Sequence, residues 1–332
     1  MSSGGCPGKV SDALAWAKSI LAKNKVATSE WDAALLLAHL LGVSRAELHF
    51  GRERGLTAEE RRRFQEAVAR RASREPLQYL IGSQGFMGLE FSVDRRVLIP
   101  RPDTEILVEA VLDFLAGRAV AAGVTPAGSD APDSAGLLVA DIGTGSGAIA
   151  ISLARLEPRC RVAAVDLSPD ALEVARANAR SNGVEDRVQF LCGDLLDPLK
   201  SLGPFDALVS NPPYIPPEEA LLLEPEVGDH EPQIALLSGP DPLSFYRRLA
   251  LGAGPLLKPG GCLAVEVGAG RAPEVESLFR RVLPASSTRM IKDYGGHERV
   301  VMGFLTDQAG APRKPPGLCP SDDRGTFVGE VH

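Results

Sequence analysis

Residues 139–149 read Val-Ala-Asp-Ile-Gly-Thr-Gly-Ser-Gly-Ala-Ile, a short apolar run that leads through a glycine-rich turn into a helical pattern. A buried strand followed by such a turn is typical of nucleotide-binding α/β folds, because glycines let the backbone turn tightly and approach a ligand. The glycines are spaced G-x-G-x-G, whereas a dinucleotide fingerprint has G-x-G-x-x-G. Asp141, at the end of the strand, suits an ammonium or sulfonium group better than two phosphates. The turn therefore favours S-adenosylmethionine over NAD.

From this stretch onward, short apolar segments alternate with helical patterns. The predicted strands are 137–142, 162–166, 188–192, 205–210 and 262–267, with a terminal pair near 288–292 and 299–304. Such alternation predicts a mainly parallel sheet with helices on both faces.

Two further acids follow the next two predicted strands. Asp166 ends the strand 162–166, where a carboxylate can accept both hydroxyls of a ribose. Asp194 follows the strand 188–192 and could meet an adenine amino group. A single acid at a strand end is more often the N-cap of the next helix than a ligand. Three acids at successive strand ends, with the glycine-rich turn, predict a nucleoside pocket.

A second motif, Asn211-Pro212-Pro213-Tyr214, comes directly after the predicted strand 205–210. In a doubly wound sheet the first and fourth strands are neighbours where the strand order reverses, and ligands bind at their carboxyl ends. We therefore expect this motif to meet the glycine-rich turn. The alternative is a stiff proline-rich loop or a ligand for a partner protein.

The motif suits the chemistry of a planar nitrogen, which is a poor nucleophile because its lone pair is delocalised. If the Asn211 side-chain oxygen and the Pro212 carbonyl each accept one N–H, the nitrogen is oriented and its lone pair is freed for attack. The prolines add rigidity without a competing donor, and Tyr214 can stack on the acceptor. No strong base is needed before attack, which agrees with the lack of a persuasive His-Asp pair.

Upstream, residues 10–73 have a helical pattern. One apolar face comprises Val10, Leu14, Ala17 and Leu21, and another comprises Trp31, Leu35 and Ala38. Ser44 with Glu47 and Thr57 with Glu60 have the spacing of capping boxes, and Gly42 suits a helix end. The last helix carries six arginines, which form either a solvated face or a docking surface for an acidic or RNA-rich partner: Arg61, Arg62, Arg63, Arg70, Arg71 and Arg74.

These patterns divide the chain into four parts. We predict a helical domain over 1–77, a β-hairpin linker over 78–100, an α/β domain over 101–305 and a disordered tail over 306–332. Within the α/β domain, the Ala-, Gly- and Pro-rich residues 117–136 are expected to form a flexible surface insertion.

Composition excludes several classes of protein. Of 332 residues, 36 are Lys or Arg and 43 are Asp or Glu, a formal net charge of −7, which argues against wrapping duplex DNA. No apolar run approaches the ~20 residues of a membrane span, and the N-terminus lacks the core of a secretory signal, so we expect a cytoplasmic protein. The five scattered cysteines contain no CxxC, so no metal site or disulfide is predicted.

The sequence resembles the PrmC/HemK family of glutamine-N(5) methyltransferases over about residues 10–304. The resemblance rests on Leu98–Glu105 (Leu-Ile-Pro-Arg-Pro-Asp-Thr-Glu), Asp141–Gly147, Asn211–Tyr214, His230-Glu231-Pro232 with Ala235-Leu236, Phe245-Tyr246-Arg247, and Asp293-Tyr294-Gly295 with Glu298-Arg299-Val300. It implies a class I S-adenosylmethionine-dependent methyltransferase, with a Rossmann-like, seven-stranded, mostly parallel sheet and a small helical N-domain. It also implies a substrate, the glutamine in the Gly-Gly-Gln loop of class 1 peptide chain release factors, which the N-domain helps to grip.

The resemblance also implies the roles of individual residues. Gly143, Thr144, Gly145, Ser146 and Gly147 should wrap the methionine part of the cofactor, Asp166 its ribose, and Asp194 with Leu195 its adenine end; Asp141 and Asn211 complete the predicted cofactor contacts. Asn211, Pro212, Pro213 and Tyr214 should hold the acceptor glutamine. We expect a monomer that does not contact nucleic acid directly.

Four alternatives remain at this stage. A methyltransferase for an exocyclic base amine would use the same Asn-Pro-Pro-Tyr motif on a flipped base. A relative that modifies a ribosomal protein glutamine would share every motif. A non-catalytic scaffold would have no need to keep both halves of the site, and a nicotinamide oxidoreductase would leave residues 211–214 unexplained.

Overall fold

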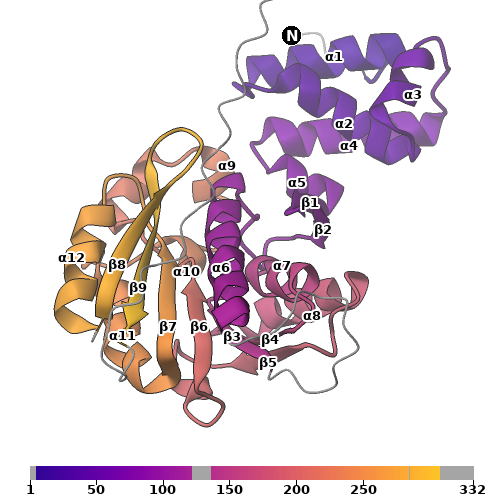
Figure 1. The fold of residues 1–332 in the computed structure, drawn as a ribbon. Coiled ribbons are helices and arrows are strands. Elements are labelled where there is room, and N and C mark those ends of the chain that lie inside the picture. Colours follow the sequence, from indigo (N-terminus) through magenta and orange to yellow (C-terminus); the bar gives the residue numbers. More distant parts are fainter. Residues whose placement is uncertain (1–4, 122–135, 284, 307–332) are drawn as a thin grey trace, which may run out of the picture.

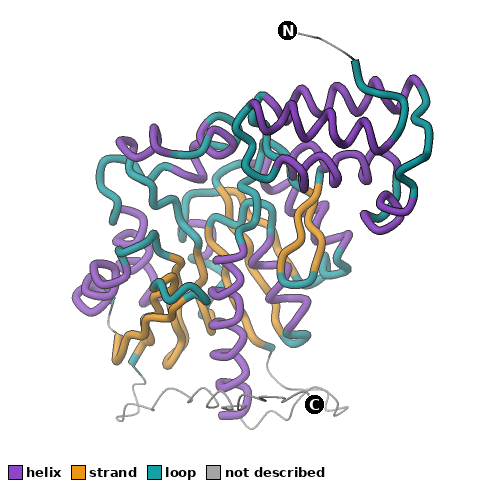
Figure 2. Tube along the Cα trace, turned by 90° about the horizontal axis from the view of Figure 1, so that it is seen from above, coloured by secondary structure: helices purple, strands orange, loops and turns teal. Residues whose placement is uncertain are grey.

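The computed structural model describes residues 5–121, 136–283 and 285–306. It consists of a helical unit, a small hairpin and a sheet with helices on both faces (Figure 1). In Figure 2 the helical unit lies to one side of the sheet. The tail after Thr306 and most of the predicted insertion lie outside the described residues.

The helical unit contains five helices: α1 (Val10–Lys23), α2 (Ser29–Leu41), α3 (Arg45–Phe50), α4 (Ala58–Ala72) and α5 (Leu77–Ile81). The predicted face of α1 is confirmed, since Val10, Ala17 and Leu21 are buried and Leu14 packs against the same core. The predicted face of α2 is wrong at one position. Trp31 is 51% exposed and lies under the Arg45 guanidinium, whose carbon is 3.5 Å from the ring centroid. The Trp31 side chain therefore faces solvent, although α2 as a whole packs against α1, α4 and α5.

Local capping signals in this unit are confirmed. The Ser44 hydroxyl accepts from the Glu47 amide at 3.2 Å, and the Glu47 carboxylate accepts from the Ser44 amide at 2.7 Å. Thr57 and Glu60 make the same reciprocal pair at 3.2 and 2.8 Å. Gly42 ends α2 with a φ of +65°, which an L side chain rarely adopts.

A hairpin of β1 (Ser83–Phe86) and β2 (Leu89–Ser92) connects the helical unit to the sheet domain. One side chain ties it to the domain. The Asn178 amide accepts from the Ser92 N–H at 2.7 Å and donates to the carbonyl oxygens of Ser92 and Ser146 at 3.0 and 2.9 Å. The hairpin is therefore bonded, through one buried asparagine, to the glycine-rich turn.

Seven strands form the sheet in the order β5-β4-β3-β6-β7-β9-β8. They are β3 (Leu137–Ile142), β4 (Cys160–Asp166), β5 (Val188–Cys192), β6 (Phe205–Ser210), β7 (Leu257–Glu266), β8 (Ala285–Lys292) and β9 (Glu298–Leu305). The first five are parallel, and β9 is antiparallel to both β7 and β8. The predicted mostly parallel, seven-stranded sheet is confirmed.

Several boundaries differ from the prediction: β4 begins two residues early at Cys160 and β8 three residues early at Ala285, and two differences are larger. β7 begins at Leu257 rather than 262, because Leu257 pairs with Phe205 before the register shifts and Cys262 pairs with Ala207. The Pro-Gly-Gly residues between them are incompatible with a regular strand pattern. α6 (Pro102–Ala121) continues through residues 117–121, which were assigned to the insertion. Gly117 does not end the helix, since Arg118 in the next position pairs with the buried Asp206 at 3.1 Å.

Helices cover both faces of the sheet. α6, α7 (Ala148–Leu156) and α8 (Pro169–Ser181) pack on one face, and α11 (Ser244–Ala253) and α12 (Ala272–Val282) pack on the other. Figure 1 shows α6 in front of the sheet. The remaining helical segments of the described residues are short: η1 (Asp197–Leu199), η2 (Pro217–Leu222), α9 (Pro225–Gly228), α10 (Gln233–Leu236) and η3 (Gly254–Leu256), where η marks a 3-10 helix. None of the helices in the described ranges is both long and apolar enough to cross a bilayer.

Ion pairs join the helical unit to the loop between β6 and α11. Arg71, 5% exposed, bonds the Asp32 carboxylate at 2.7 Å and the Glu226 carboxylate at 2.8 Å. Arg74 bonds Glu226 at 2.7 Å and Glu224 at 2.8 Å.

These contacts correct both interpretations for Arg71 and Arg74, whereas Arg62, Arg63 and Arg70 are exposed, as the solvated-face interpretation predicts. Arg71 and Arg74 are neither fully solvated nor free to dock a partner. Arg62 and Arg70 pair with glutamates of their own unit, Arg62 with Glu59 and Glu66 and Arg70 with Glu75. The sequence could not show this, because the carboxylates that bind Arg71 and Arg74 are far away along the chain.

Replacing Arg71 tests this junction. Arg71→Met leaves the buried Asp32 carboxylate without its guanidinium, so we expect the free energy of unfolding to fall by about 3 kcal/mol or more. Arg62→Met, on α4 but in an exposed pair, should change the free energy of unfolding far less. Urea denaturation of both variants measures the difference, and equal losses would contradict the structural role of Arg71.

Candidate functional site

The site lies where β3 and β6 run side by side. Ile142 pairs with Ser210 at their carboxyl ends, and the Ser210 hydroxyl donates to the Ile142 carbonyl oxygen at 2.7 Å. The residues that follow these two strands are therefore held together. The structure brings the glycine-rich turn and Asn211–Tyr214 to one edge of the sheet, as the sequence predicts.

The three glycines of the turn have different functions. All have positive φ, +77° at Gly143, +54° at Gly145 and +83° at Gly147. A Cβ at Gly147 would lie 2.7 Å from Cδ1 of Ile151 and 3.2 Å from Cβ of Ala175, so this glycine lets the turn pack against α7 and α8. Gly143 and Gly145 have open space on that side instead, and both line a cavity.

Asp141 lies beneath the turn rather than in the cavity lining. It is fully buried, and its Oδ2 accepts from the Thr144 hydroxyl at 2.6 Å and from the Ala150 amide at 3.1 Å. Its Oδ1 is buried without a hydrogen-bond partner among the described residues. Burial raises the pKa of Asp141 to about 7, although its two hydrogen bonds oppose the shift. Asp141 thus holds the turn against the first turn of α7.

Asp166 faces the cavity at the end of β4. Its two carboxylate oxygens accept from the Gly145 amide at 2.8 Å and from the Ser168 amide at 2.9 Å. Each oxygen keeps a second lone pair, so the carboxylate can still accept hydroxyl hydrogens from a ligand. Asp166 therefore joins the glycine-rich turn to the start of α8 and offers acceptors to the cavity.

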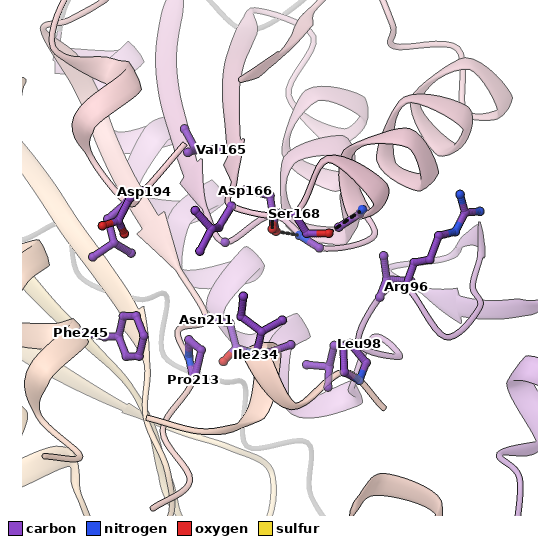
Figure 3. Close-up of a pocket in the computed structure, with 18 of the residues that line it drawn as sticks. Arg96, Leu98, Val165, Asp166, Ser168, Asp194, Asn211, Pro213, Ile234 and Phe245 are labelled. Carbon is purple, nitrogen blue, oxygen red and sulfur yellow. Dashed lines mark hydrogen bonds between the residues drawn. The ribbon is translucent and has the colours of Figure 1, made fainter. Parts of the chain in front are cut away.

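Asp194 and Leu195 form the far wall of the cavity. Leu195 has a φ of +49°, a strained value for a leucine, and the Asp194 carboxylate pairs with Arg248 at 2.5 Å. Figure 3 shows Asp194 and Phe245 at one end of the cavity and Arg96 at the other, with Asp166 and Asn211 between them.

Counted together with the space that is open to solvent, the cavity has a volume of about 820 Å³. Several lining residues were not predicted as contacts: Arg96, Val97, Leu98, Leu167, Ser168, Pro232, Ile234, Ala235 and Phe245. Of the predicted residues, Gly143, Gly145, Asp166, Asp194, Leu195, Asn211 and Pro213 line it. Thr144, Ser146, Gly147 and Pro212 support this wall from neighbouring positions.

Asn211 also lines a second, smaller cavity of about 590 Å³, together with Arg101, Tyr214, Ile215 and Val227. Leu98 and Ala235 likewise line both cavities. The Tyr214 ring lies against Gly268, where a Cβ would be 3.1 Å from its Cδ2, and burial raises the pKa of its phenol to about 12. Asn211 is therefore at the junction of the two cavities.

An ion pair between Arg101, which lines the second cavity, and the buried Glu231 lies beside this cavity. Glu231, 4% exposed, accepts from the Ile99 amide at 3.1 Å and from the Arg101 guanidinium. Burial raises the pKa of Glu231, and the Arg101 charge opposes this. The two segments joined here were noted in the sequence as motifs, but their contact could not be predicted because about 130 residues separate them.

This arrangement can hold a group-transfer donor in the larger cavity and a planar acceptor in the smaller one. None of the described residues lining either cavity is a histidine, and no cluster of His, Cys, Asp or Glu in the described part could hold a metal ion.

Comparisons with known proteins agree with this geometry. Residues 12–82 match the model of the PrmC N-terminal domain, and residues 133–283 match that of a methyltransferase domain. A release factor glutamine methyltransferase from Moorella thermoacetica is 43% identical over 89% of this chain and 98% of its own length. Proteins of the same name from Chlorobaculum tepidum and Bacillus cereus are 40% and 37% identical, over 85% and 90% of this chain and 92% and 99% of theirs.

The chain belongs to the release factor glutamine methyltransferase family. The predicted resemblance is thereby confirmed, and so is the class I methyltransferase fold with its helical N-terminal region. Among solved structures, the hMettl16 catalytic domain in complex with the MAT2A 3′UTR hairpin 6 aligns with a TM-score of 0.52 at 16% identity. The alignment covers 74% of this chain and 84% of that one. At this identity the likeness concerns the fold alone.

The buried carboxyl under the turn makes a prediction about pH. In this family member the folded state keeps a proton on Asp141 up to about pH 7, whereas the unfolded chain loses it near 3.8. Stability from this group is therefore present at low pH and is lost as the pH rises toward 7.

Asp141→Asn keeps one acceptor oxygen and removes the titration. As the pH rises from 5 to 7 the native protein loses stability and the variant does not. The free energy of unfolding of the variant should therefore increase relative to that of the native protein, by at most about 1.4 kcal/mol per pH unit. Urea denaturation of both proteins across this range gives the value. Two stability curves that run parallel with pH would show that Asp141 does not titrate in this way.

Proposed function

We propose that this protein transfers a methyl group from S-adenosylmethionine to the side-chain amide nitrogen of the glutamine in the Gly-Gly-Gln motif of class 1 release factors. The observation that carries the proposal is the position of Asn211, which lines both the larger cavity and the smaller one. The relatives named as release factor glutamine methyltransferases support the choice of substrate.

The larger cavity fits this cofactor in its donor set. Gly143 and Gly145 present backbone without a side chain, as close approach of a methionine moiety requires. Asp166 has lone pairs left for the two ribose hydroxyls, and Asp194 with Leu195 borders the adenine end. When bound, the cofactor supplies an electrophilic methyl group on a sulfonium.

The chain's own residues prepare the acceptor. The Asn211 side-chain oxygen and the Pro212 carbonyl accept the two amide N–H groups and turn the nitrogen lone pair toward the junction of the cavities. Pro212 and Pro213 fix the backbone, and Tyr214, which stays neutral, borders the smaller cavity where the planar amide lies. The proton leaves after methylation, so no side-chain base is required in the wall of either cavity.

The decisive experiment is mass spectrometry of a purified, unmethylated release factor after incubation with the protein and S-adenosylmethionine. We expect one added methyl group on the loop glutamine and none in a Gln→Ala loop variant. No transfer, with cofactor binding confirmed by calorimetry, would overturn this substrate. A ribosomal protein and a single-stranded oligonucleotide in parallel reactions test the two other planar nitrogens. We place the reaction in the cytoplasm, where release factors meet the ribosome, and expect a monomer.

Two substitutions separate acceptor binding from cofactor binding. Asn211→Ala removes an acceptor for the amide N–H, so kcat should fall by about 100-fold or more while cofactor affinity changes little. Asp166→Ala removes the acceptors for the ribose, so cofactor affinity should fall first. Calorimetry and initial rates on both variants give the two values, and unchanged turnover in Asn211→Ala would contradict the mechanism.

A further inference from the structure

Two buried polar side chains lie next to Asn211 without lining the larger or the smaller cavity. Thr104 is near the start of α6, and Glu266 is the last residue of β7. They are 5% and 2% exposed. The mechanism described above uses neither of them, although burying a carboxyl group is costly unless its contacts offset the loss of water.

The roles of donor and acceptor among these residues determine how the Asn211 amide is oriented. The Asn211 amide nitrogen donates to the Thr104 hydroxyl oxygen at 3.1 Å. A hydroxyl that accepts this hydrogen keeps its own proton to donate elsewhere. A carboxyl group that can accept it is that of Glu266, whose pKa is lowered by its neighbours Thr104 and Asn211 acting as hydrogen-bond donors. An ionised carboxylate can only accept, so the Asn211 amino group must face it.

This polarity decides which atom of Asn211 remains for a ligand. An asparagine amide has an oxygen on one side and an amino group on the other, and either can occupy a given position by rotation about χ2. With the amino group held by Thr104 and Glu266, the oxygen is the end left to face the cavities. A substrate amide that offers N–H groups requires that oxygen.

Several charged and titratable groups surround Glu266 and affect the pKa of its carboxyl. Asp103 on α6, Arg299 on β9 and Tyr214 after β6 act on its carboxyl, and the Tyr246 hydroxyl from α11 donates to its backbone oxygen at 3.2 Å. Burial raises the pKa of Glu266 to about 7, and the hydrogen bonds from Thr104 and Asn211 and the charge of Arg299 oppose the shift. One oxygen, Oε2, has no hydrogen-bond partner among the described residues.

We propose that Thr104 and Glu266 are positioning residues that fix the orientation of the Asn211 amide, so that its oxygen receives the N–H of the acceptor. The inference rests on the proposed function, since it assigns Asn211 to an amide-bearing acceptor. Protonated Glu266 becomes a donor and no longer requires the amino group of Asn211, so methyl transfer should increase with pH through the ionisation of this carboxyl.

The kinetic test compares substitutions that change polarity but keep shape. Thr104→Val removes the hydroxyl at constant volume, and we expect kcat to fall about 10-fold to 100-fold with little change in cofactor affinity. Thr104→Ser restores the hydroxyl and should recover kcat to within about 3-fold of the native value. Equal losses in the Val and Ser variants would overturn the proposal, because packing and not polarity would then be at work.

Glu266→Gln provides the pH test. The native protein should gain activity between about pH 6 and 8, and the variant should lose this rise because its side chain does not titrate. Glu276→Gln is the matched control: Glu276 is on α12, and Arg280 holds the pKa of its carboxyl below the usual range, so the rise should remain. A rise that persists in Glu266→Gln would overturn the proposal.

A measurement without any substrate keeps this inference separate from the proposed function. The side-chain ¹⁵N–¹H signals of Asn211, assigned by their loss in Asn211→Asp, should shift with pH near 7 in the native protein and not in Glu266→Gln. Absent or unchanged titration of these signals would overturn the positioning proposal, whatever the substrate. Failure of the native protein to methylate a release factor would overturn the proposed function and leave this spectroscopic result standing.

Discussion

The pairing of β3 with β6 is the constraint on which the site depends. These strands are far apart in the sequence, yet Ile142 lies beside Ser210 and accepts its hydroxyl hydrogen at 2.7 Å. One residue further on, the first strand enters the glycine-rich turn and the second enters Asn211. A shift of one residue in this register would turn the side chains of either strand to the opposite face and separate the two motifs. The buried apolar residues on both faces of these strands, such as Val139 and Ala140, hold the register.

The carboxyl groups of the site are divided between support and binding. Asp141 and Glu266 are buried, each has one oxygen without a partner among the described residues, and burial raises the pKa of each to about 7. Such groups lower stability at neutral pH, and the fold keeps them where a backbone turn or an amide must be held in one orientation. Asp166, at the surface of the cavity, does both tasks, because its oxygens bond two backbone amides and retain free lone pairs.

The sequence contains the information for the sheet and for the two motifs because both are local patterns. Apolar runs specify the strands, and the cap at Ser44 needs only Glu47 in the same turn. What could not be predicted depends on distant contacts. Arg71 pairs with Glu226 across 155 residues, and the side chain of Glu231 reaches Ile99 across 132. Asp141 is a different case, because its partners Thr144 and Ala150 are close in the sequence, and they hold its oxygens under the turn rather than in the lining of the cavity. The motif at 98–105 signalled Thr104 without showing that it bonds Asn211.

The helical unit contributes to the site through the loop between β6 and α11. This loop provides Ile215, Val227 and Ala235 to the smaller cavity. Its attachments include the bonds of Glu226 to Arg71 and Arg74 of the helical unit and of Glu231 to Arg101. Inside the loop, Ile215 bridges to Leu237. The bonds from Arg71 and Arg74 therefore connect the loop that lines the smaller cavity to the helical unit. Both parts of the chain thus contribute to the frame of the cavity that we propose for the acceptor, and Asn211 lines that same cavity.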